Sequence, residues 1–397
     1  GERPAVVTAI AKYNATEIWR QVINDGMDVL GGAAISRVPR NLLAHAYMGT
    51  PICITVEGAN ILTRTLMIFG QGAIRCHPYA YRELDAIQRG DRKAFDRAFW
   101  PHIGHVVCNG VRTALLGLTR GLLTRSPGRG ETARHWRRLN WSAAEFAFMA
   151  DVAMGTLGGN LKRKEKLTGR FADWFSWLFL AAAALRRFEA EGRRHDDLGV
   201  VHWVLEHAFE RMQHARVGIY QNLRLPGLGH ALRWTLGVLA RVNPFGSGPS
   251  DGTGQRAARA LLQPSGLRDR LTQRIHLDDD AANGMAGAHA TAASQRSGLA
   301  RLERALQLCV DAEPILKKLK DAVRAGRLPK ARPTHLLEQA LDNGILTTAE
   351  RDLVKAAELA RSEAVAVDSF TLAEYLATAD AAARDPEPNA EFARPPR

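Results

Sequence analysis

The residue best suited to chemistry in this sequence is Glu57, a carboxylate that stands between an apolar run and a glycine. The run Pro51 to Val56 precedes it and Gly58 follows. Burial among apolar residues raises the pKa of a carboxylate towards neutrality, where a general base works best. Gly58 would let a substrate approach the main chain. The alternative is that Glu57 lies in the first turn of a helix and complements its dipole. The residues alone favour neither interpretation.

A pair of glycines, Gly31 and Gly32, follows the first predicted helix. Apolar residues recur at helical spacing from about Ala5 to Leu30, and glycine commonly ends a helix. A helix stop is therefore sufficient to explain the pair. Two glycines also expose main-chain N–H groups and allow the backbone to approach a phosphate or a ring of a ligand.

The composition describes a folded, mostly helical protein with a strong positive charge. Of 397 residues, 46% are hydrophobic and 24% are charged, which excludes an intrinsically disordered chain. Long stretches rich in Ala, Leu, Arg and Glu predict an all-α fold. The formal net charge of +13 favours anionic partners, namely nucleic acid, acidic lipid or a phosphorylated ligand. Composition does not choose among them.

Neither the cysteines nor the histidines predict a metal site. The four cysteines are far apart and form no C-x-x-C pair, which indicates a reducing compartment without disulfides or zinc. His102 and His105 are three residues apart with no carboxylate at ligand spacing. His202 and His207 are five apart, on different helix faces. We interpret all four as ordinary core or surface residues. The acidic triplet Asp278 to Asp280 lacks the pattern of a calcium loop and is typical of a helix start.

The sequence contains no segment long and apolar enough to cross a membrane. Its longest apolar run, Trp174 to Leu185, has 12 residues, whereas a spanning helix needs roughly 20. No signal peptide is recognisable. We therefore expect a cytoplasmic protein, with association with the inner membrane left open. The chain begins Gly1-Glu2-Arg3-Pro4, without Met, which suggests a piece cut from a longer protein.

Turns and changes in composition divide the chain into four predicted parts. Residues 1–77 end at a turn-rich segment, and residues 78–245 form an additional helical domain that ends at a glycine-rich stretch. Residues 246–384 are a further helical region, and residues 385–397 form a tail with too little apolar content to fold. We predict long helices over residues 141–154 and 171–188, a helical pair over 95–123, and helices over 301–325 and 336–364.

Three motifs together resemble the C-terminal helical domain of acyl-CoA dehydrogenases. They are Ala11-Lys12 in the first helix, the Gly31-Gly32 pair, and Val56-Glu57-Gly58 with Arg64 seven residues beyond the glutamate. The wider sequence of residues 57–64 and 69–78 resembles large bacterial fatty-acid acyl-CoA dehydrogenases of the FadE type. The resemblance extends along the chain through residues 157–163, 201–203 and 365–370.

The resemblance implies an FAD-dependent oxidoreductase that converts fatty acyl-CoA to trans-2-enoyl-CoA, the first step of fatty-acid β-oxidation. Glu57 would take the α-proton, while its backbone N–H and a hydroxyl of the cofactor would bind the thioester oxygen as charge develops there. Gly58 would keep the substrate wall free of a side chain. Gly31 and Gly32 would lie against the FAD of a neighbouring subunit, which implies a homo-oligomer. Electron-transfer flavoprotein is the implied electron acceptor.

The sequence departs from the family pattern at positions that ordinarily help to hold the flavin. Ala59 stands where the family has Thr, Ile61 where it has Gln, and Asp28 where Gln is commoner. These departures weaken the FAD contacts more than the assignment of the base. In the family an N-terminal helical domain and a middle β-domain supply most of the flavin site, and this sequence contains no strand-rich stretch. We therefore expect this chain neither to retain FAD nor to turn over by itself.

An alternative function is a non-catalytic basic helical module that docks on anionic membrane or on a partner protein. The candidate segments are the basic run Lys162 to Lys166 together with Arg170, and the amphipathic segment Leu225 to Val242, which contains Trp234. A solvated helix face explains the first equally well, and packing on the bundle explains the second. Nucleic acid is not an expected partner, because aromatic residues hardly interleave with basic ones and no reader motif is present.

Overall fold

The computed structural model describes residues 6–36, 41–223, 229–263, 266–273, 290–374 and 376–377. Every regular element within these ranges is helical, which confirms the predicted all-α fold. The triplet Asp278 to Asp280 and the predicted tail over residues 385–397 lie outside the described residues.

The chain divides into two compact units that alternate along the sequence. Unit 1 contains Gly1–Asn24 and Tyr47–Ile275, and unit 2 contains Asp25–Ala46 and His276–Arg397. The four parts predicted from the sequence are divided at other residues than these two spatial units. The units do not test that division, which stays a prediction.

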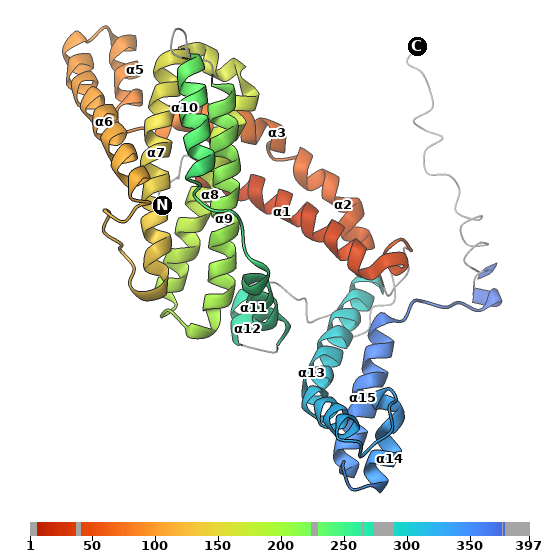
Figure 1. Ribbon diagram of the computed structural model, residues 1–397. Helices are drawn as coiled ribbons and strands as arrows, with labels where there is room; N and C mark the ends of the chain where they lie inside the picture. Colours follow the sequence, from red (N-terminus) through yellow and green to blue (C-terminus); the bar gives the residue numbers. More distant parts are fainter. Residues whose placement is uncertain are drawn as a thin grey trace, which may run out of the picture. The chain divides into compact units, whose positions relative to one another are not determined.

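Unit 1 is a helical bundle (Figure 1). Helices α1 (Val7–Leu30) and α2 (Ala44–Thr55) each contribute residues to both units. The other helices of unit 1 are α3 (Asn60–Leu62), the π-helix η2 (Thr63–Gln71), α4 (Gly72–Cys76), α5 (Ala80–Arg89), α6 (Arg92–Leu118), η3 (Gly130–Thr132), α7 (Ala133–Leu157), η4 (Gly158–Arg163), α8 (Glu165–Ala190), η5 (His195–Asp197), α9 (Leu198–Asn222), α10 (Gly229–Val242), α11 (Asp251–Leu262) and α12 (Gly266–Thr272).

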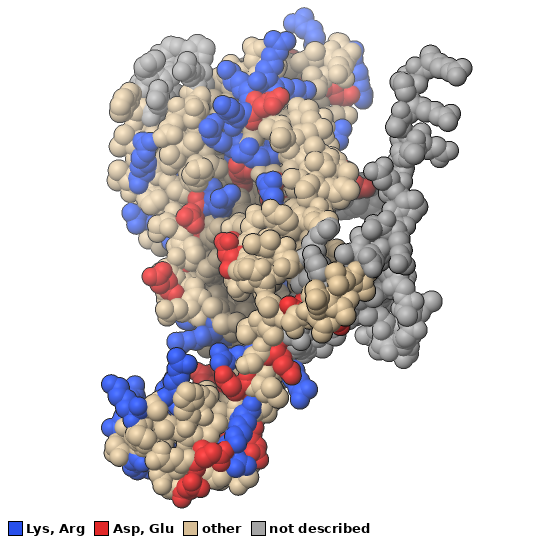
Figure 2. All heavy atoms as spheres, turned by 90° about the vertical axis from the view of Figure 1, so that its right-hand side faces the viewer, with Lys and Arg blue, Asp and Glu red and all other residues tan. Residues whose placement is uncertain are grey.

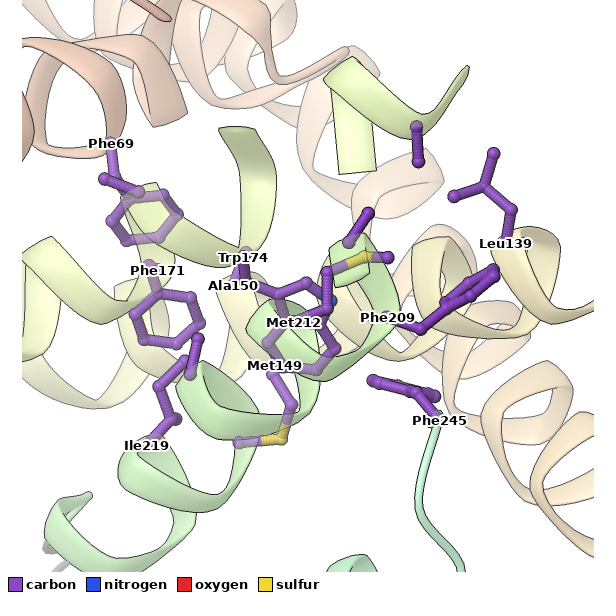
Figure 3. Packing of buried hydrophobic residues seen from close by; sticks show 14 of the residues in the cluster. Phe69, Leu139, Met149, Ala150, Phe171, Trp174, Phe209, Met212, Ile219 and Phe245 are labelled. Carbon is purple, nitrogen blue, oxygen red and sulfur yellow. The ribbon is translucent and has the colours of Figure 1, made fainter. Parts of the chain in front are cut away.

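The core of unit 1 lies between α7, α8 and α9, whose inward faces carry large side chains (Figure 3). Trp174 of α8 and Met212 of α9 are fully buried, as is Phe245 after α10. Phe69 of η2 stacks on Phe171 of α8 with ring centroids 4.4 Å apart. This stack joins the segment that follows Glu57 to the centre of the bundle, since aromatic side chains contribute large buried areas.

The helices predicted over residues 141–154 and 171–188 lie within the longer α7 and α8, but the sequence divided α6 wrongly. Residues 95–123 were expected to form a helical pair, and they contain one helix, α6, followed by an irregular segment. Asp91 caps this helix by accepting a hydrogen bond from the Ala94 N–H at 2.9 Å. The chain turns after Leu118 through Arg120 and Gly121, both at positive φ. A Cβ on Gly121 would stand 2.5 Å from the Arg137 carbonyl oxygen, so only glycine allows this close approach to α7.

No single helix among the described residues is long and apolar enough to span a membrane. One pair, Ala44–Thr55 with Asn60–Cys76, passes that test jointly and is bent by 48°. Ile68 and Phe69 of this pair are buried in the protein core.

Unit 2 has a smaller core formed by α13 (Ala290–Arg324), η7 (Pro333–Leu336), α14 (Leu337–Asp342) and α15 (Thr348–Val365). Residues 336–364 were predicted to be one helix, and they form two. The chain reverses at Gly344, where φ is +64°, and α15 then begins with a capping box between Thr347 and Glu350. The periodicity of the apolar residues continues through this turn, which explains the error.

A buried polar network joins α7 to α9 inside the bundle. Arg216 donates from Nη2 to Glu145 Oε2 at 3.0 Å, and the Tyr220 hydroxyl donates to Glu145 Oε1 at 2.6 Å. The side chains of Arg216 and Glu145 are only 4% and 2% exposed. Burial, together with the nearby Glu145 carboxylate, raises the pKa of Tyr220 well above its ordinary value. The network is satisfied only when all three members are present.

Removing the positive charge of this network should destabilise the protein strongly. Arg216→Met leaves Glu145 buried without its charge partner, so we expect the free energy of unfolding to fall by about 3–5 kcal/mol. Urea denaturation followed by circular dichroism measures the change. Arg187→Met is the matched control, because Arg187 is 49% exposed and pairs with Glu191 on the surface, and it should cost about 1 kcal/mol or less. Equal losses in the two variants would contradict this assignment.

Candidate active-site segment

Glu57 and Gly58 form an open turn between α2 and α3. Both residues have positive φ, +56° for Glu57 and +90° for Gly58, and both are exposed. The left-handed conformation is uncommon for a residue other than glycine and costs about 1–3 kcal/mol. Helix α3 begins at Asn60 after Ala59, with no acidic residue in its first turn. The alternative in which Glu57 complements the helix dipole is therefore wrong.

The main chain of this turn is held by hydrogen bonds from α1 and η2. The Gly58 carbonyl accepts from Lys12 Nζ at 2.9 Å and from the Thr63 hydroxyl at 3.1 Å. Lys12 Nζ also donates to Asn60 Oδ1 at 2.8 Å, and the buried Asn60 amide donates to Glu17 Oε1 at 2.8 Å. These bonds fix the backbone on the C-terminal side of Glu57 and leave its side chain free.

An ion pair with good geometry holds η2 on α8. Arg64 donates from Nε to Asp173 Oδ1 at 2.8 Å and from Nη2 to Asp173 Oδ2 at 2.5 Å. This hydrogen bonding to Asp173 raises the pKa of Arg64. Gly169 of α8 lies beneath the guanidinium, where an added Cβ would stand 2.8 Å from Arg64 Nη1. The pair thus fixes η2, the helix that follows the Glu57-Gly58 turn and α3, on α8.

Lysine cannot reproduce the two parallel bonds of Arg64, so Arg64→Lys should reduce stability. We expect a loss of about 1–2 kcal/mol in the free energy of unfolding, because a two-point bond to a half-buried carboxylate becomes a single contact. Arg89→Lys is the control, since Arg89 is 72% exposed and pairs with Asp85 one helical turn away. Guanidinium denaturation of both variants gives the comparison. An unchanged midpoint for Arg64→Lys would show that η2 does not depend on the pair.

Gly31 and Gly32 belong to unit 2, whereas Glu57 and Gly58 belong to unit 1. The glycine pair follows α1 in the short helix η1 (Gly31–Ala34), which confirms that α1 ends there. Gly31 has φ of +58°, and a Cβ added to either glycine would meet no atom within 4 Å. The pair is exposed, so its backbone is accessible to a flat ligand.

A polar cavity of about 360 Å³ lies beside the α1 residues that hold the turn. It is lined from α1, α8 and α9 by residues that include Tyr13, Glu17, Arg20 and Arg211. Burial and the nearby Asp173 raise the pKa of Tyr13 to about 12, so the phenol stays protonated at neutral pH. Arg20 pairs with Glu17 inside the cavity. Glu57, Gly58, Gly31 and Gly32 do not line this cavity.

The structure brings together a group of ionisable side chains that the sequence did not predict. His77, His102 and Asp151 place ligand-type atoms within 4.8 Å of one another. His102 Nδ1 donates to Glu83 Oε1 at 2.7 Å, and His77 Nε2 lies 2.9 Å from Asp151 Oδ1. The side chain of Asp151 is 2% exposed. His102 was interpreted as an ordinary residue, because Asp151 is 49 positions away and on another helix.

The hydrogen bonds of His77 argue against metal ligation by this group. His77 Nδ1 accepts from the Tyr79 N–H at 3.2 Å and from the Ala80 N–H at 3.0 Å, at the start of α5. In the neutral ring the proton is therefore on Nε2, which faces Asp151 and has no lone pair for a cation. We interpret the cluster as a polar contact that joins α5, α6 and α7.

These features define a helical domain that presents a carboxylate on an exposed, firmly held turn. A family model described as acyl-CoA dehydrogenase, C-terminal, bacterial type, matches residues 74–370. The chain belongs to this family, which confirms the resemblance inferred from its motifs. The match begins after Gly31, Gly32, Glu57 and Gly58, so their roles stay predictions. No solved structure matches the chain.

Proposed function

We propose that this chain takes part in the α,β-dehydrogenation of fatty acyl-CoA to trans-2-enoyl-CoA, with Glu57 as the base that takes the α-proton. The observation that carries the proposal is the open Glu57-Gly58 turn in a chain that belongs to the acyl-CoA dehydrogenase family. Helix α1 and η2 hold the turn from behind, so the carboxylate is fixed at its backbone and exposed in front. A positioned carboxylate of this kind is what proton abstraction next to a thioester requires.

The backbone of the same turn supports a second role. Among the described residues, no acceptor is found for the N–H of Glu57. This donor is available to the thioester oxygen, on which negative charge grows as the α-proton leaves. Gly58 carries no Cβ, which leaves the approach clear. Glu57 thus supplies both a base through its side chain and a donor through its main chain.

The cofactor proposed for the reaction is FAD, which when bound accepts the β-hydrogen as hydride. Gly31 and Gly32 are the residues of this chain that fit it, because their uncovered backbone allows a flat ring to approach. By the family resemblance that flavin belongs to a neighbouring subunit, so the working enzyme is a homo-oligomer. Electron-transfer flavoprotein is the proposed acceptor of the electrons, and the cytoplasm, with contact to the inner membrane, is the proposed location.

The 397-residue chain by itself should not retain FAD. Glu57, Gly31 and Gly32 are exposed, so a flavin held only by them would dissociate. The visible absorbance of the chain after incubation with FAD and gel filtration measures retention. Stoichiometric FAD in the protein peak would overturn this prediction.

In the flavin-loaded enzyme, Glu57→Gln should lower enoyl-CoA formation by at least about a hundredfold, because an amide does not accept the α-proton. Flavin content should be unchanged, since Glu57 is proposed to contact substrate. Glu165→Gln is the control, as Glu165 is also exposed and begins α8. Stopped-flow reduction of the flavin by acyl-CoA separates the chemical step from later electron transfer. A near-normal reduction rate in Glu57→Gln would place the base elsewhere.

A further inference from the structure

The outward face of α6 is an apolar stripe that nothing in the described residues covers. Its large apolar residues follow one another at intervals of three or four positions, so they share one side of the helix. They are Trp100 (66% exposed), Ile103 (42%), Val107 (61%), Val111 (54%), Leu115 (48%) and Leu118 (84%). Large apolar side chains exposed in a continuous row mark an interaction surface.

The opposite side of α6 is firmly attached to the bundle, which fixes the direction of the stripe. Ala98, Asn109 and Leu116 are buried there. His102 also lies on this side, between Glu83 of α5 and Asp151 of α7. The stripe therefore faces away from the bundle, and α6 does not need to rotate to offer it to a partner.

Exposed apolar side chains also lie on α10, whose C-terminal end is joined to that of α6. Asn243, just after α10, donates from Nδ2 to the Gly117 carbonyl at 2.7 Å and accepts from Arg120 Nε at 3.1 Å. These bonds join the ends of the two helices. Exposed apolar side chains lie on both sides of this junction: Leu122 (69%) and Leu123 (67%) after α6, and Trp234 (70%), Leu239 (53%) and Val242 (70%) on α10.

The charges around this surface are mostly positive, although the exposed Asp96 lies one helical turn before Trp100. Between Arg97 and Arg129 the sequence contains Arg112, Arg120 and Arg125 and no Asp or Glu. From Leu223 to Ser250 there is again no carboxylate, and Arg241 stands exposed near the end of α10. Another face of the molecule also shows more lysine and arginine than carboxylate side chains, although there both signs are present (Figure 2).

We propose that the outward faces of α6 and α10 dock on the surface of an anionic lipid bilayer. A second copy of the chain is a poor occupant, since a two-fold contact places the same patch on both sides and would bring together arginines that outnumber the carboxylates there. Lipid phosphates supply the missing negative charge, and tryptophan favours the membrane interface. At 27 residues, α6 is about 40 Å long. In the proposed complex its axis lies parallel to the bilayer surface, so that the whole apolar stripe contacts the lipid. The proposal does not depend on the dehydrogenation.

The location of this surface differs from the sequence-based expectation in one respect. Helix α10 falls within Leu225 to Val242, a segment already considered for membrane contact. The basic run Lys162 to Lys166 does not adjoin the stripe in sequence. No large apolar residue that flanks this run in the sequence is exposed. It therefore provides a basic control segment of the same molecule.

Co-sedimentation of the 397-residue chain with lipid vesicles tests the proposal. The chain should bind vesicles of mixed phosphatidylglycerol and phosphatidylcholine, bind pure phosphatidylcholine much more weakly, and lose affinity as salt increases. The double variant Val107→Ser/Val111→Ser should bind the anionic vesicles about tenfold or more weakly, because two apolar side chains no longer enter the interface. Leu359→Ser, at a residue of α15 that is 64% exposed, should bind as the unmodified chain does.

The arginines give an independent measurement. Arg112→Gln should weaken binding about fivefold, which corresponds to the contribution of one basic residue near an anionic surface. Arg163→Gln, in the basic run, should have no effect. Circular dichroism verifies that all variants keep their helices, as surface substitutions should. Binding that is unchanged in the Val107/Val111 variant, or equal on neutral and anionic vesicles, would overturn the proposal. So would a lipid-free dimer, seen by analytical ultracentrifugation, that this variant dissociates.

Discussion

The attachment of η2 to α8 is the constraint on which the candidate site depends. Two contacts make it: the Arg64–Asp173 ion pair and the stack of Phe69 on Phe171. With η2 fixed, Thr63 and Lys12 reach the Gly58 carbonyl and hold the turn from both sides. Their hydrogen bonds offset the cost of a left-handed glutamate, which an unsupported loop would avoid. A carboxylate that must take a proton at one defined position needs a fixed main chain, and these hydrogen bonds supply it.

The elements that sequence periodicity predicted well are those whose formation is local. The end of α1 at Gly31 and the helices α7 and α8 follow from apolar spacing and a glycine stop. The π-helix and the positive φ of Glu57 do not follow from apolar spacing. They are held by contacts between residues that are distant in the sequence: Arg64 pairs with Asp173, 109 residues away, and the Gly58 carbonyl accepts from Lys12, 46 residues away. Residue types suggested that Glu57 was chemically important, but only the observed start of α3 at Asn60 decided against its being a helix-dipole residue.

The same limit explains the surface and the histidine cluster. Apolar periodicity in α6 predicts a helix but does not say that one of its apolar sides is left uncovered, since each side has the spacing of a packing face. Likewise, spacing arguments for metal ligands compare residues within one helix, and His77, His102 and Asp151 come from three separate segments. Their hydrogen bonds, and not their positions in the sequence, decide between a cation site and a structural contact.

The family match and the proposed chemistry occupy different parts of the chain, and this separation is informative. Residues 74–370 carry the match, whereas the base and the glycines precede it. Helix α6, α10 and their arginines lie within the matched region, which contains none of the residues proposed for proton transfer. A region of this size that adds an uncovered apolar face with basic flanks makes physical sense if it determines where the reaction takes place. Fatty acyl chains partition into bilayers because of their apolar surface, and an enzyme held at the bilayer surface by α6 would meet them at a higher local concentration.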